Sequence, residues 1–457
     1  MKAYREYKDS EIEWVKQIPS AWEICKLKYT ALGKGQCFID GDWIESKDIS
    51  TDGIRYLTSG NVGPLKYKEQ GNGYITEETF RKLECKDVYE GDILISRLNE
   101  PISRACIVPN LNSRIVTCVD NVIYRPDSNR FNKKFIVYVL NCTPYTENAN
   151  LSARGVTMHR VSRTMLGNFY IPVPSIAEQE AIASFLDAKT KPIDDIIAKR
   201  EKQIELLEEM KSAIVSRAVT KGLNPNAKMK DSGIEWIKTE PQSWETRRIK
   251  NVITLLTDYD ANGSFADIAK NVKVNVGEPY AWMVRATDLA NKRYGIVDDN
   301  NYCNKETYDF LSKSSLEAGD ILIAKRGDIG KSYEVPKCDC PMTLAPNTYL
   351  LKTNKKVIRN RFFHYFFMSD YGKKQLSINN KSTTIGAIYK DDVKNLKILL
   401  PPMDEQQAIA SYLDSETSKI DTRIAKRRKQ IELLQEYKQA LITAAVTGKI
   451  DVREYIS

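Results

Sequence analysis

The sequence predicts an α+β protein in which two α/β domains alternate with two long helices that form an antiparallel coiled coil. The first observation is a repeat, because residues 178–220 and 405–447 are identical at 27 of 43 positions without a gap. The second is a shorter echo, "KDSEIEWVKQIPSAWE" at 8–23 and "KDSGIEWIKTEPQSWE" at 230–245. Repeats of this kind indicate repeated structural units. We therefore expect, in order, a domain at 1–177, a helix region at 178–224, a domain at 225–404 and a helix region at 405–457.

Both large segments contain short β-rich runs separated by Gly, Asn and Pro, which is typical of small sheets joined by turns. Examples are "GDILIS" and "NVIYRP" in the first segment, and "DILIAK" and "NTYLLKT" in the second. One clear helical pattern follows in each, at 132–142 and at 360–377. His364 lies in the second pattern among four phenylalanines, and we interpret it as a packed or surface histidine, not a ligand.

Each long helix region follows a strand that ends in proline, at Pro174 in the first copy and Pro401 in the second. The residues that come next, "EQEAIASFLDAKT" and "EQQAIASYLDSET", have the pattern of a short amphipathic helix with Ile182 and Phe185 on one face. Pro192 suits the first turn of a helix, where a missing N–H costs nothing. We therefore expect a second, longer helix to begin near Pro192.

The longer helices carry apolar residues at the a and d spacing of a coiled coil in both copies. Arg200 and Lys211, like Arg427 and Lys438, interrupt the apolar seam, and polar residues at such positions fix register. A core helix within one domain would explain a single copy, whereas two matched copies favour a coiled coil about a pseudo-two-fold axis with one domain at each end. Its helix would span roughly 42 Å, comparable to the roughly 34–36 Å of one DNA turn. The predicted spacer and docking residues are Ile197, Arg200, Ile204, Leu207, Ile214, Ile424, Arg427, Ile431, Leu434 and Leu441.

Composition narrows the class of protein. With 457 residues, 42% hydrophobic and 28% charged, the chain is typical of a folded multidomain protein, and no apolar run is long enough to cross a membrane. The first residues lack the apolar core of a signal peptide, so we expect the cytoplasm. Nine scattered cysteines without a C-x-x-C motif predict free thiols and no zinc site, with Cys338 and Cys340 as a weak candidate for a soft metal. The net charge of +9 is compatible with nucleic acid, although an ordinary basic surface would explain it equally well.

Motifs for catalysis are missing from the sequence. "KRGDIGKS" at 325–332 fails as a P-loop because Lys325 stands where the motif needs its first Gly. The segment 126–134 begins like a nuclease motif but lacks the second carboxylate and the lysine at workable spacing. Neither an Asn-Pro-Pro-aromatic or Asp-Pro-Pro-aromatic tetrapeptide nor a G-x-S-x-G elbow is present. We therefore expect a binding or organising protein with no catalytic residue, metal or cofactor in this chain.

Loops at matched places in the two domains have the chemistry of DNA contacts. They follow each "GDILI" run, at 96–104 and 324–332, and precede each closing strand, at 152–163 and 380–390. Lys and Arg neutralise phosphates, and Arg and Asn read base edges. An ordinary solvated loop is the alternative for any one of them, while their matched placement and divergent sequences favour two readers of different sequences. The candidates are Thr58, Asn61, Arg97, Asn99, Arg104, Arg154, Thr157, His159, Arg160, Arg285, Thr287, Lys325, Arg326, Lys331, Lys381, Thr383, Thr384, Tyr389 and Lys390.

The two repeated motifs together, "KDSGIEWIK…PQSWE" and "LLPPMDEQQAIASYLDSETSKIDTRIAKRRKQIELLQEYKQALITAAVTGKIDVR", resemble the specificity subunit of type I restriction–modification systems. The resemblance implies a non-catalytic subunit whose two target recognition domains, 1–177 and 225–404, each read half of a split site in double-stranded DNA. The helices would be spacer and docking surface for two modification subunits. S-adenosylmethionine and ATP with Mg²⁺ would be bound by modification and restriction (motor) subunits, not by this chain.

Two other functions fit parts of the pattern. A structural coiled-coil adaptor between protein partners would also conserve the helices. The DNA-reading arm of a different methyltransferase or phage-defence system would share the domains as well.

Overall fold

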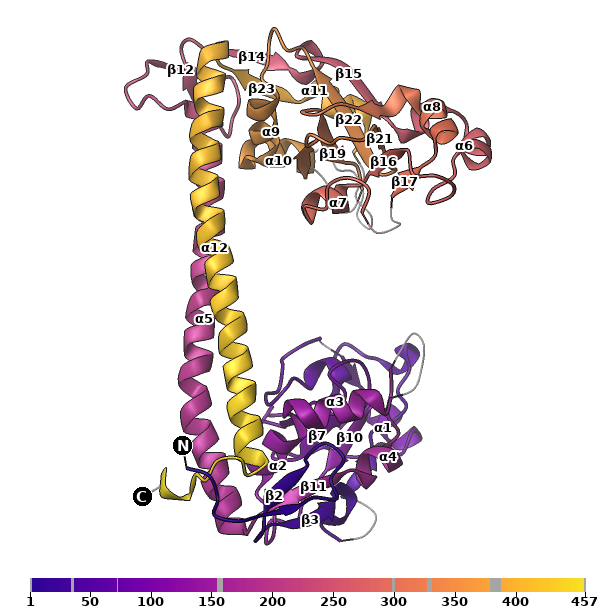
Figure 1. Cartoon of the computed structure of the whole chain (residues 1–457), viewed down its shortest axis with the longest axis vertical. Helices are drawn as coiled ribbons and strands as arrows, with labels where there is room; N and C mark the ends of the chain where they lie inside the picture. The colour runs from indigo at the N-terminus through magenta and orange to yellow at the C-terminus, as the bar shows by residue number, and fades with distance from the viewer. Residues whose placement is uncertain are drawn as a thin grey trace. The chain divides into compact units, whose positions relative to one another are not determined.

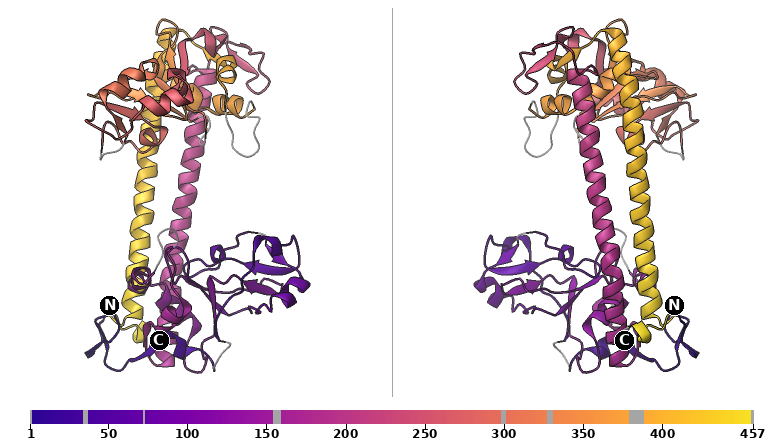
Figure 2. Two further views of the ribbon diagram at one scale, coloured as in Figure 1. Left: turned by 90° about the vertical axis from the view of Figure 1, so that its right-hand side faces the viewer. Right: turned by 90° about the vertical axis from the view of Figure 1, so that its left-hand side faces the viewer.

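The computed structural model describes residues 2–33, 37–71, 73–153, 159–297, 301–326, 331–378 and 388–455. The chain forms two compact units (Figures 1 and 2). Unit 1 is Met1–Glu201 with Arg428–Ser457, and unit 2 is Lys202–Arg427. Both long helices contribute a segment to each unit, so each unit contains one domain and two helix segments.

Unit 1 is built on an antiparallel four-stranded sheet in the order β4-β10-β7-β8. The same unit contains a three-stranded sheet in the order β6-β5-β9, in which β5 and β9 are parallel. Two further pairs of strands, β1-β2 and β11-β3, are antiparallel. The strands are β1 Tyr7–Asp9, β2 Gln17–Pro19, β3 Glu23–Lys26, β4 Phe38–Asp40, β5 Ile54–Leu57, β6 Tyr74–Ile75, β7 Ile93–Ser96, β8 Ala105–Ile107, β9 Ile115–Thr117, β10 Asn121–Tyr124 and β11 Tyr170–Val173. The helices of its domain are α1 Glu77–Lys82, α2 Lys133–Leu140, α3 Thr143–Leu151 and α4 Arg163–Asn168, with short 3₁₀ turns at Leu27–Thr30, Ser46–Asp48 and Ser59–Asn61.

Unit 2 repeats this plan, with sheets β15-β22-β19-β20 and β17-β16-β21-β18 and the pairs β12-β13 and β14-β23. Its strands are β12 Met229–Asp231, β13 Thr239–Pro241, β14 Glu245–Arg248, β15 Ile253–Asp258, β16 Ala281–Val284, β17 Tyr302–Cys303, β18 Ser315–Leu316, β19 Ile321–Ala324, β20 Ser332–Glu334, β21 Met342–Leu344, β22 Thr348–Thr353 and β23 Lys397–Leu400. Its helices are α6 Phe265–Asn271, α7 Ala286–Ala290, α8 Lys305–Phe310, α9 Asn360–Met368, α10 Asp370–Ile378 and α11 Lys390–Asn395, with 3₁₀ turns at Ile249–Asn251, Tyr259–Asn262 and Ser312–Ser314. The repeated "GDILI" runs are the fully buried strands β7 and β19, each between two partners.

Each main core joins a domain to the end of a long helix. In unit 1, buried α2 residues such as Phe135 and Ile136 share a cluster with Leu441, Ile442 and Val446 at the end of α12. In unit 2, the phenylalanines of α9 share a cluster with Val215, Ala218 and Val219 at the end of α5. Burial of apolar surface contributes a free energy of about 25 cal/mol for each Å² removed from water. The many large apolar side chains in these clusters therefore hold each helix end firmly in its unit.

The two long helices are continuous, which corrects the expectation of a separate helix beginning near Pro192. Helix α5 spans Ile176–Lys221 with Pro192 inside it, and α12 spans Met403–Val446. Pro192 is exposed, so the carbonyl of Ala188 that loses its helical bond can face water. Packing of buried neighbours such as Leu186 and Ile193 outweighs the local cost of the proline.

The helix expected at 360–377 is likewise corrected, because it is two helices, α9 and α10, separated at Ser369. The Ser369 Oγ donates to Phe366 O and accepts from the N–H of Gly372. A hydroxyl that bonds the backbone in this way competes with the helical ladder and starts a new helix.

The C-terminal tail packs against the N-terminus within unit 1. Val452 is buried, the Asp451 N–H donates to Lys2 O, and the Lys2 Nζ lies 2.7 Å from a Glu454 carboxylate oxygen. Helix α12 leads into Gly448, which has a left-handed φ of +70° and where a Cβ would lie 2.3 Å from Pro19. In unit 2 the chain continues directly from α5 into the domain. In unit 1 the tail that follows α12 takes the corresponding place in the fold. Among the described residues, no helix is long and apolar enough to cross a membrane.

Candidate nucleic-acid interface and helix junctions

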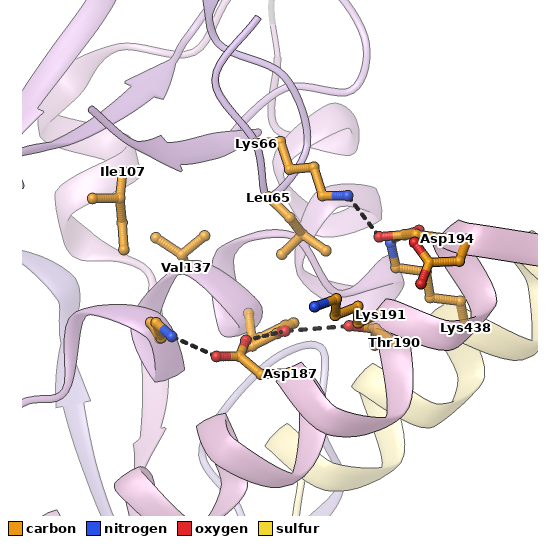
Figure 3. A pocket seen from close by; sticks show the side chains of 12 residues that line it. Leu65, Lys66, Ile107, Val137, Asp187, Thr190, Lys191, Asp194 and Lys438 are labelled. Carbon is orange, nitrogen blue, oxygen red and sulfur yellow. Dashed lines mark hydrogen bonds and ion pairs between the residues drawn. The ribbon is translucent and has the colours of Figure 1, made fainter. Parts of the chain in front are cut away.

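The junction between domain and long helix repeats the same kinds of side-chain contact in both units. In unit 1, the Tyr138 hydroxyl donates to Asp187 at 2.8 Å and lies 3.5 Å from the Thr190 hydroxyl, and Lys134 pairs with the same Asp187 (Figure 3). In unit 2, the Tyr365 hydroxyl donates to Asp414 at 2.7 Å and lies 3.3 Å from Thr417 Oγ, and Arg361 pairs with Asp414. The repeated stretches of α5 and α12 thus hold their domains through the same contacts.

Two buried glutamines add a second copied contact at the start of each long helix. The Gln179 Oε1 accepts from the Asn132 N–H at 2.9 Å, and the Gln406 Oε1 accepts from the Arg359 N–H at 2.8 Å. Each amide nitrogen donates to two backbone carbonyls, one of them that of Pro174 or Pro401. Both side chains are fully buried and fully bonded, which fixes the angle at which the helix leaves the domain.

The lysines predicted to interrupt the seam pair with acids on the opposite helix. In unit 1, Lys438 of α12 lies 2.6 Å from Asp194 of α5, and Lys66 of the domain reaches the same carboxylate at 2.7 Å (Figure 3). In unit 2, the repeat-related pair is Lys211 of α5 with Asp421 of α12 at 2.7 Å. Within each unit the two helix segments lie side by side and run antiparallel, as predicted (Figures 1 and 2).

The predicted seam residues are buried or half-buried. Sequence reasoning missed a second apolar feature on the outside of the helices. Leu206 and Met210 in unit 2 are about half exposed, and so are Leu433 and Tyr437, the repeat-related residues in unit 1. In unit 2 they border a hollow of about 500 Å³ between the helices, lined also by Gln203, Leu207, Arg423, Lys426 and Arg427. Apolar residues recurring outside the a and d positions in both copies were the signal for this surface.

One carboxylate and two cations meet at the same place in both domains. In unit 1, Asp40 at the end of β4 lies 3.0 Å from Arg97 and 3.4 Å from Arg163. In unit 2, Asp258 at the end of β15 lies 3.3 Å from Lys325 and 2.8 Å from Lys390. We call each set a charge clip. Its cations come from the residue after the "GDILI" strand and from the first residue of the short helix before the closing strand.

The electrostatics of the clips differ between the units. Burial lowers the pKa of Arg97, while Asp40 opposes that effect. Burial alone would raise the pKa of Asp258, but Lys390 and Lys325 outweigh it and hold that pKa below its usual value. Burial disfavours the charged form of Lys325, yet Asp260 and Asp258 raise its pKa. Asp258 and Lys325 are therefore held in their ionised forms by each other's charge.

The remaining predicted residues of unit 1 divide by exposure. Thr58, Asn99 and His159 are exposed, and the His159 ring lies 3.4 Å from Glu100. Arg160 is half-buried and lies 3.0 Å from Asp120. The structure therefore brings Arg97, Asn99, His159 and Arg160 together on neighbouring loops, as the Asn99 N–H donates to His159 O.

Asn61, Arg97 and Arg104, which the sequence predicts as DNA contacts, are buried and bond the loops around them. Their contact with DNA stays a prediction. The Asn61 amide donates to Lys68 O and Gln70 O. The Arg104 guanidinium donates to carbonyl oxygens of Val62, Ser59, Leu98, Asn99 and Pro101. A guanidinium bonded in this way ties two loops together through most of its N–H donors.

In unit 2, Arg285, Thr287, Arg326, Lys331 and Tyr389 are exposed. Arg285 pairs with buried Asp288 at 3.1 Å. Lys325 is mostly buried between Asp258 and Asp260, and Lys390 is about one-third exposed. Lys325, Lys390 and Tyr389 are brought together by the clip, since the Ile388 N–H donates to Lys325 O. The predicted residues Arg154, Thr157, Lys381, Thr383 and Thr384 lie outside the described residues.

Sequence reasoning missed Asp40, Asp258 and Arg163. Acids repel a polyanion, so an argument for DNA contacts from side-chain chemistry does not point to Asp40 or Asp258. Their matched places, at the ends of β4 and β15, are the signal.

Metal chemistry finds no support among the described residues. None of their His, Cys, Asp and Glu side chains form a group of three that could hold an ion. Cys338 and Cys340 place their sulfurs 2.9 Å apart as free thiols. His364 is packed, with Nδ1 3.1 Å from the Ser332 hydroxyl, and burial lowers its pKa to about 3. It is therefore a neutral packed histidine.

Comparisons with known proteins agree with this arrangement. A family model described as type I restriction modification DNA specificity domain matches residues 36–206 and 241–433. The chain is 27% identical to MjaX, a proposed type I restriction enzyme specificity subunit of Methanocaldococcus jannaschii, over 99% of both chains. It is 28% identical to the MjaVIII specificity subunit of the same organism over 66% of both. A solved chain from work on complex assembly and conformational transition of the type I R-M system has the same fold, with a TM-score of 0.65, 16% identity and coverage of 95% of this chain and 99% of that one. Because the family model matches most of the sequence, the chain belongs to the type I restriction–modification DNA specificity family.

Proposed function

We propose that this chain is the DNA-reading specificity subunit of a type I restriction–modification complex and performs no catalysis itself. The observation that carries the proposal is the duplication of one domain frame with divergent, positively charged loops, joined to helices whose contacts are copied. A duplicated frame with different loops suits the reading of two different half-sites, because base contacts depend on individual side chains while positioning depends on the frame.

Each domain would read its half-site with the exposed and half-buried side chains of its loops. In unit 1 these are Thr58, Asn99, His159, Arg160 and Arg163, and in unit 2 Arg285, Thr287, Arg326, Tyr389 and Lys390. Cations among them would neutralise phosphates, and the hydroxyl and amide groups would approach base edges. The long helices would set the unread gap between the half-sites.

Two modification subunits would dock on the outer faces of the helices. Leu206 with Met210 and Leu433 with Tyr437 form two copies of one apolar patch, which suits two copies of one partner. S-adenosylmethionine would be bound by those subunits, and ATP with Mg²⁺ by restriction (motor) subunits. The complex would act on double-stranded DNA in the cytoplasm.

A footprint of the full chain with its modification subunit tests the proposal. We expect two short protected half-sites separated by a gap, and an affinity that falls steeply between 50 and 200 mM salt, because bound Lys and Arg release counterions. A purely structural adaptor would give no footprint and a weak dependence on salt, and that result would contradict the proposal.

A further inference from the structure

The charge clips stand at equivalent places although the residues that form them differ. Unit 1 uses Asp40 with two arginines, and unit 2 uses Asp258 with two lysines. Each clip joins three segments that are distant in the chain, namely the end of a sheet strand, the loop after the buried strand and the start of a short helix. The geometry is therefore kept while the surrounding loop sequences diverge.

Backbone bonds at the same positions show what the clips hold. The Val161 N–H donates to Arg97 O at 3.1 Å, and the Ile388 N–H donates to Lys325 O at 3.3 Å. In unit 1 the Arg97 guanidinium also donates to Val161 O. Each clip thus fixes two loops against each other at the place where both carry candidate DNA contacts.

A carboxylate at a site for DNA is electrostatically unfavourable, since phosphates repel it. Two cations flank each acid, and the more exposed cation, Arg163 or Lys390, stays at the surface. In unit 2 a second acid, Asp260, lies 2.8 Å from Lys325 and balances the charge of that lysine. Asp40 and Asp258 reduce the general attraction to DNA but restrict where those cations can lie. That combination favours discrimination between sequences over affinity for any sequence.

We propose that Asp40 and Asp258 are positioning residues for specificity, each fixing the reading loops of its own domain. The proposal rests on the proposed function, because it assigns the acids a part in reading DNA. It gives Asp40 an effect on one half-site and Asp258 an effect on the other.

Selection of DNA from a random duplex library, by the full chain with its modification subunit, tests this role. Asp40→Asn should weaken base preference by about tenfold at one half-site, and Asp258→Asn by about tenfold at the other. Binding to non-specific DNA should stay equal or increase, because two cations are released from a carboxylate.

Matched controls are Asp52→Asn in unit 1 and Asp391→Asn in unit 2, which remove the same charge from exposed side chains. They should leave base preference unchanged. If wild type selects a bipartite sequence and both clip variants select it equally well, the clip role is overturned and the proposed function stands. Equal loss of specific and non-specific binding would also overturn the role, because it would indicate general destabilisation. If wild type selects no sequence at all, the proposed function fails and the clip role with it.

Discussion

Asp194 of α5 forms ion pairs with two other parts of unit 1. Its carboxylate contacts Lys438 of the second long helix and Lys66 of the domain. Burial alone would raise its pKa, but these two lysines outweigh burial and hold the pKa below the usual value. An acid with a depressed pKa in the folded state stabilises the fold at neutral pH.

We expect Asp194→Asn to lower the stability of unit 1 by about 1–2 kcal/mol at pH 7, because it leaves the mostly buried Lys438 without its carboxylate. The contribution is present above the unfolded pKa of about 3.9 and is lost as the pH falls through the lower folded pKa. The gap between variant and wild type should therefore narrow from pH 5 to pH 3. Urea unfolding followed across this range measures it.

Asp195→Asn is the matched control, since Asp195 is exposed on the same turn of α5. Its effect should stay within about 0.5 kcal/mol. Equal effects of the two changes, or a gap that widens in acid, would contradict the role given to Asp194.

Single residues were the hardest scale to predict from the sequence. Chemistry alone predicts Arg97 and Arg104 as DNA contacts, and the structure buries both, because loop conformation decides whether a guanidinium faces solvent or backbone carbonyls. The sequence predicts that Lys211 and Lys438 interrupt the apolar seam. It does not identify their acidic partners, because each partner lies on the opposite helix.

At the scale of elements, the repeat in the sequence predicted the long helices well, since 3.5-residue spacing of apolar side chains is a strong signal. It did not predict that each helix is continuous through Pro192 or that 360–377 contains two helices. The causes differ: packing of buried neighbours overrides the signal of Pro192, whereas the backbone bonds of Ser369 end α9 inside an otherwise helical pattern.

The exposed apolar patches give a prediction at this scale. Leu206→Ser with Met210→Ser should remove one modification subunit from the complex, and Leu433→Ser with Tyr437→Ser should remove the other, because each pair loses apolar contact area. Native mass spectrometry would show two modification subunits in wild type and one in either variant.

Glu209→Ser, beside Met210 on the exposed face, is the control and should keep both subunits. Retention of both subunits by the two patch variants would show that docking uses another surface.

For the whole molecule, the repeat predicted two domains of one architecture because copied boundaries enclosed divergent segments. Within each unit that frame is confirmed down to the copied contacts of Tyr138 and Tyr365. The loops could not be predicted, because their conformations depend on tertiary contacts such as the charge clips.

If the paired helices set the unread gap, matched insertions should lengthen it. Seven residues inserted after Arg200 and seven after Arg427 add two turns to both helices between the copied ion pairs, which keeps each pair intact. The gap should grow by about 10 Å, or about three base pairs. Footprinting measures the gap, and insertion into one helix alone should abolish binding because it breaks the register. An unchanged gap after the matched insertion would show that the helices are not the ruler.

In the proposed complex the modification subunits would methylate adenine at the sites this chain reads. A map of N6-methyladenine in DNA of the source cell, with and without this chain, therefore tests the central claim most directly. We predict methylated adenines in a bipartite sequence with a fixed gap, all lost when the chain is removed and restored when it is returned. Methylation that is unchanged without the chain would contradict the account.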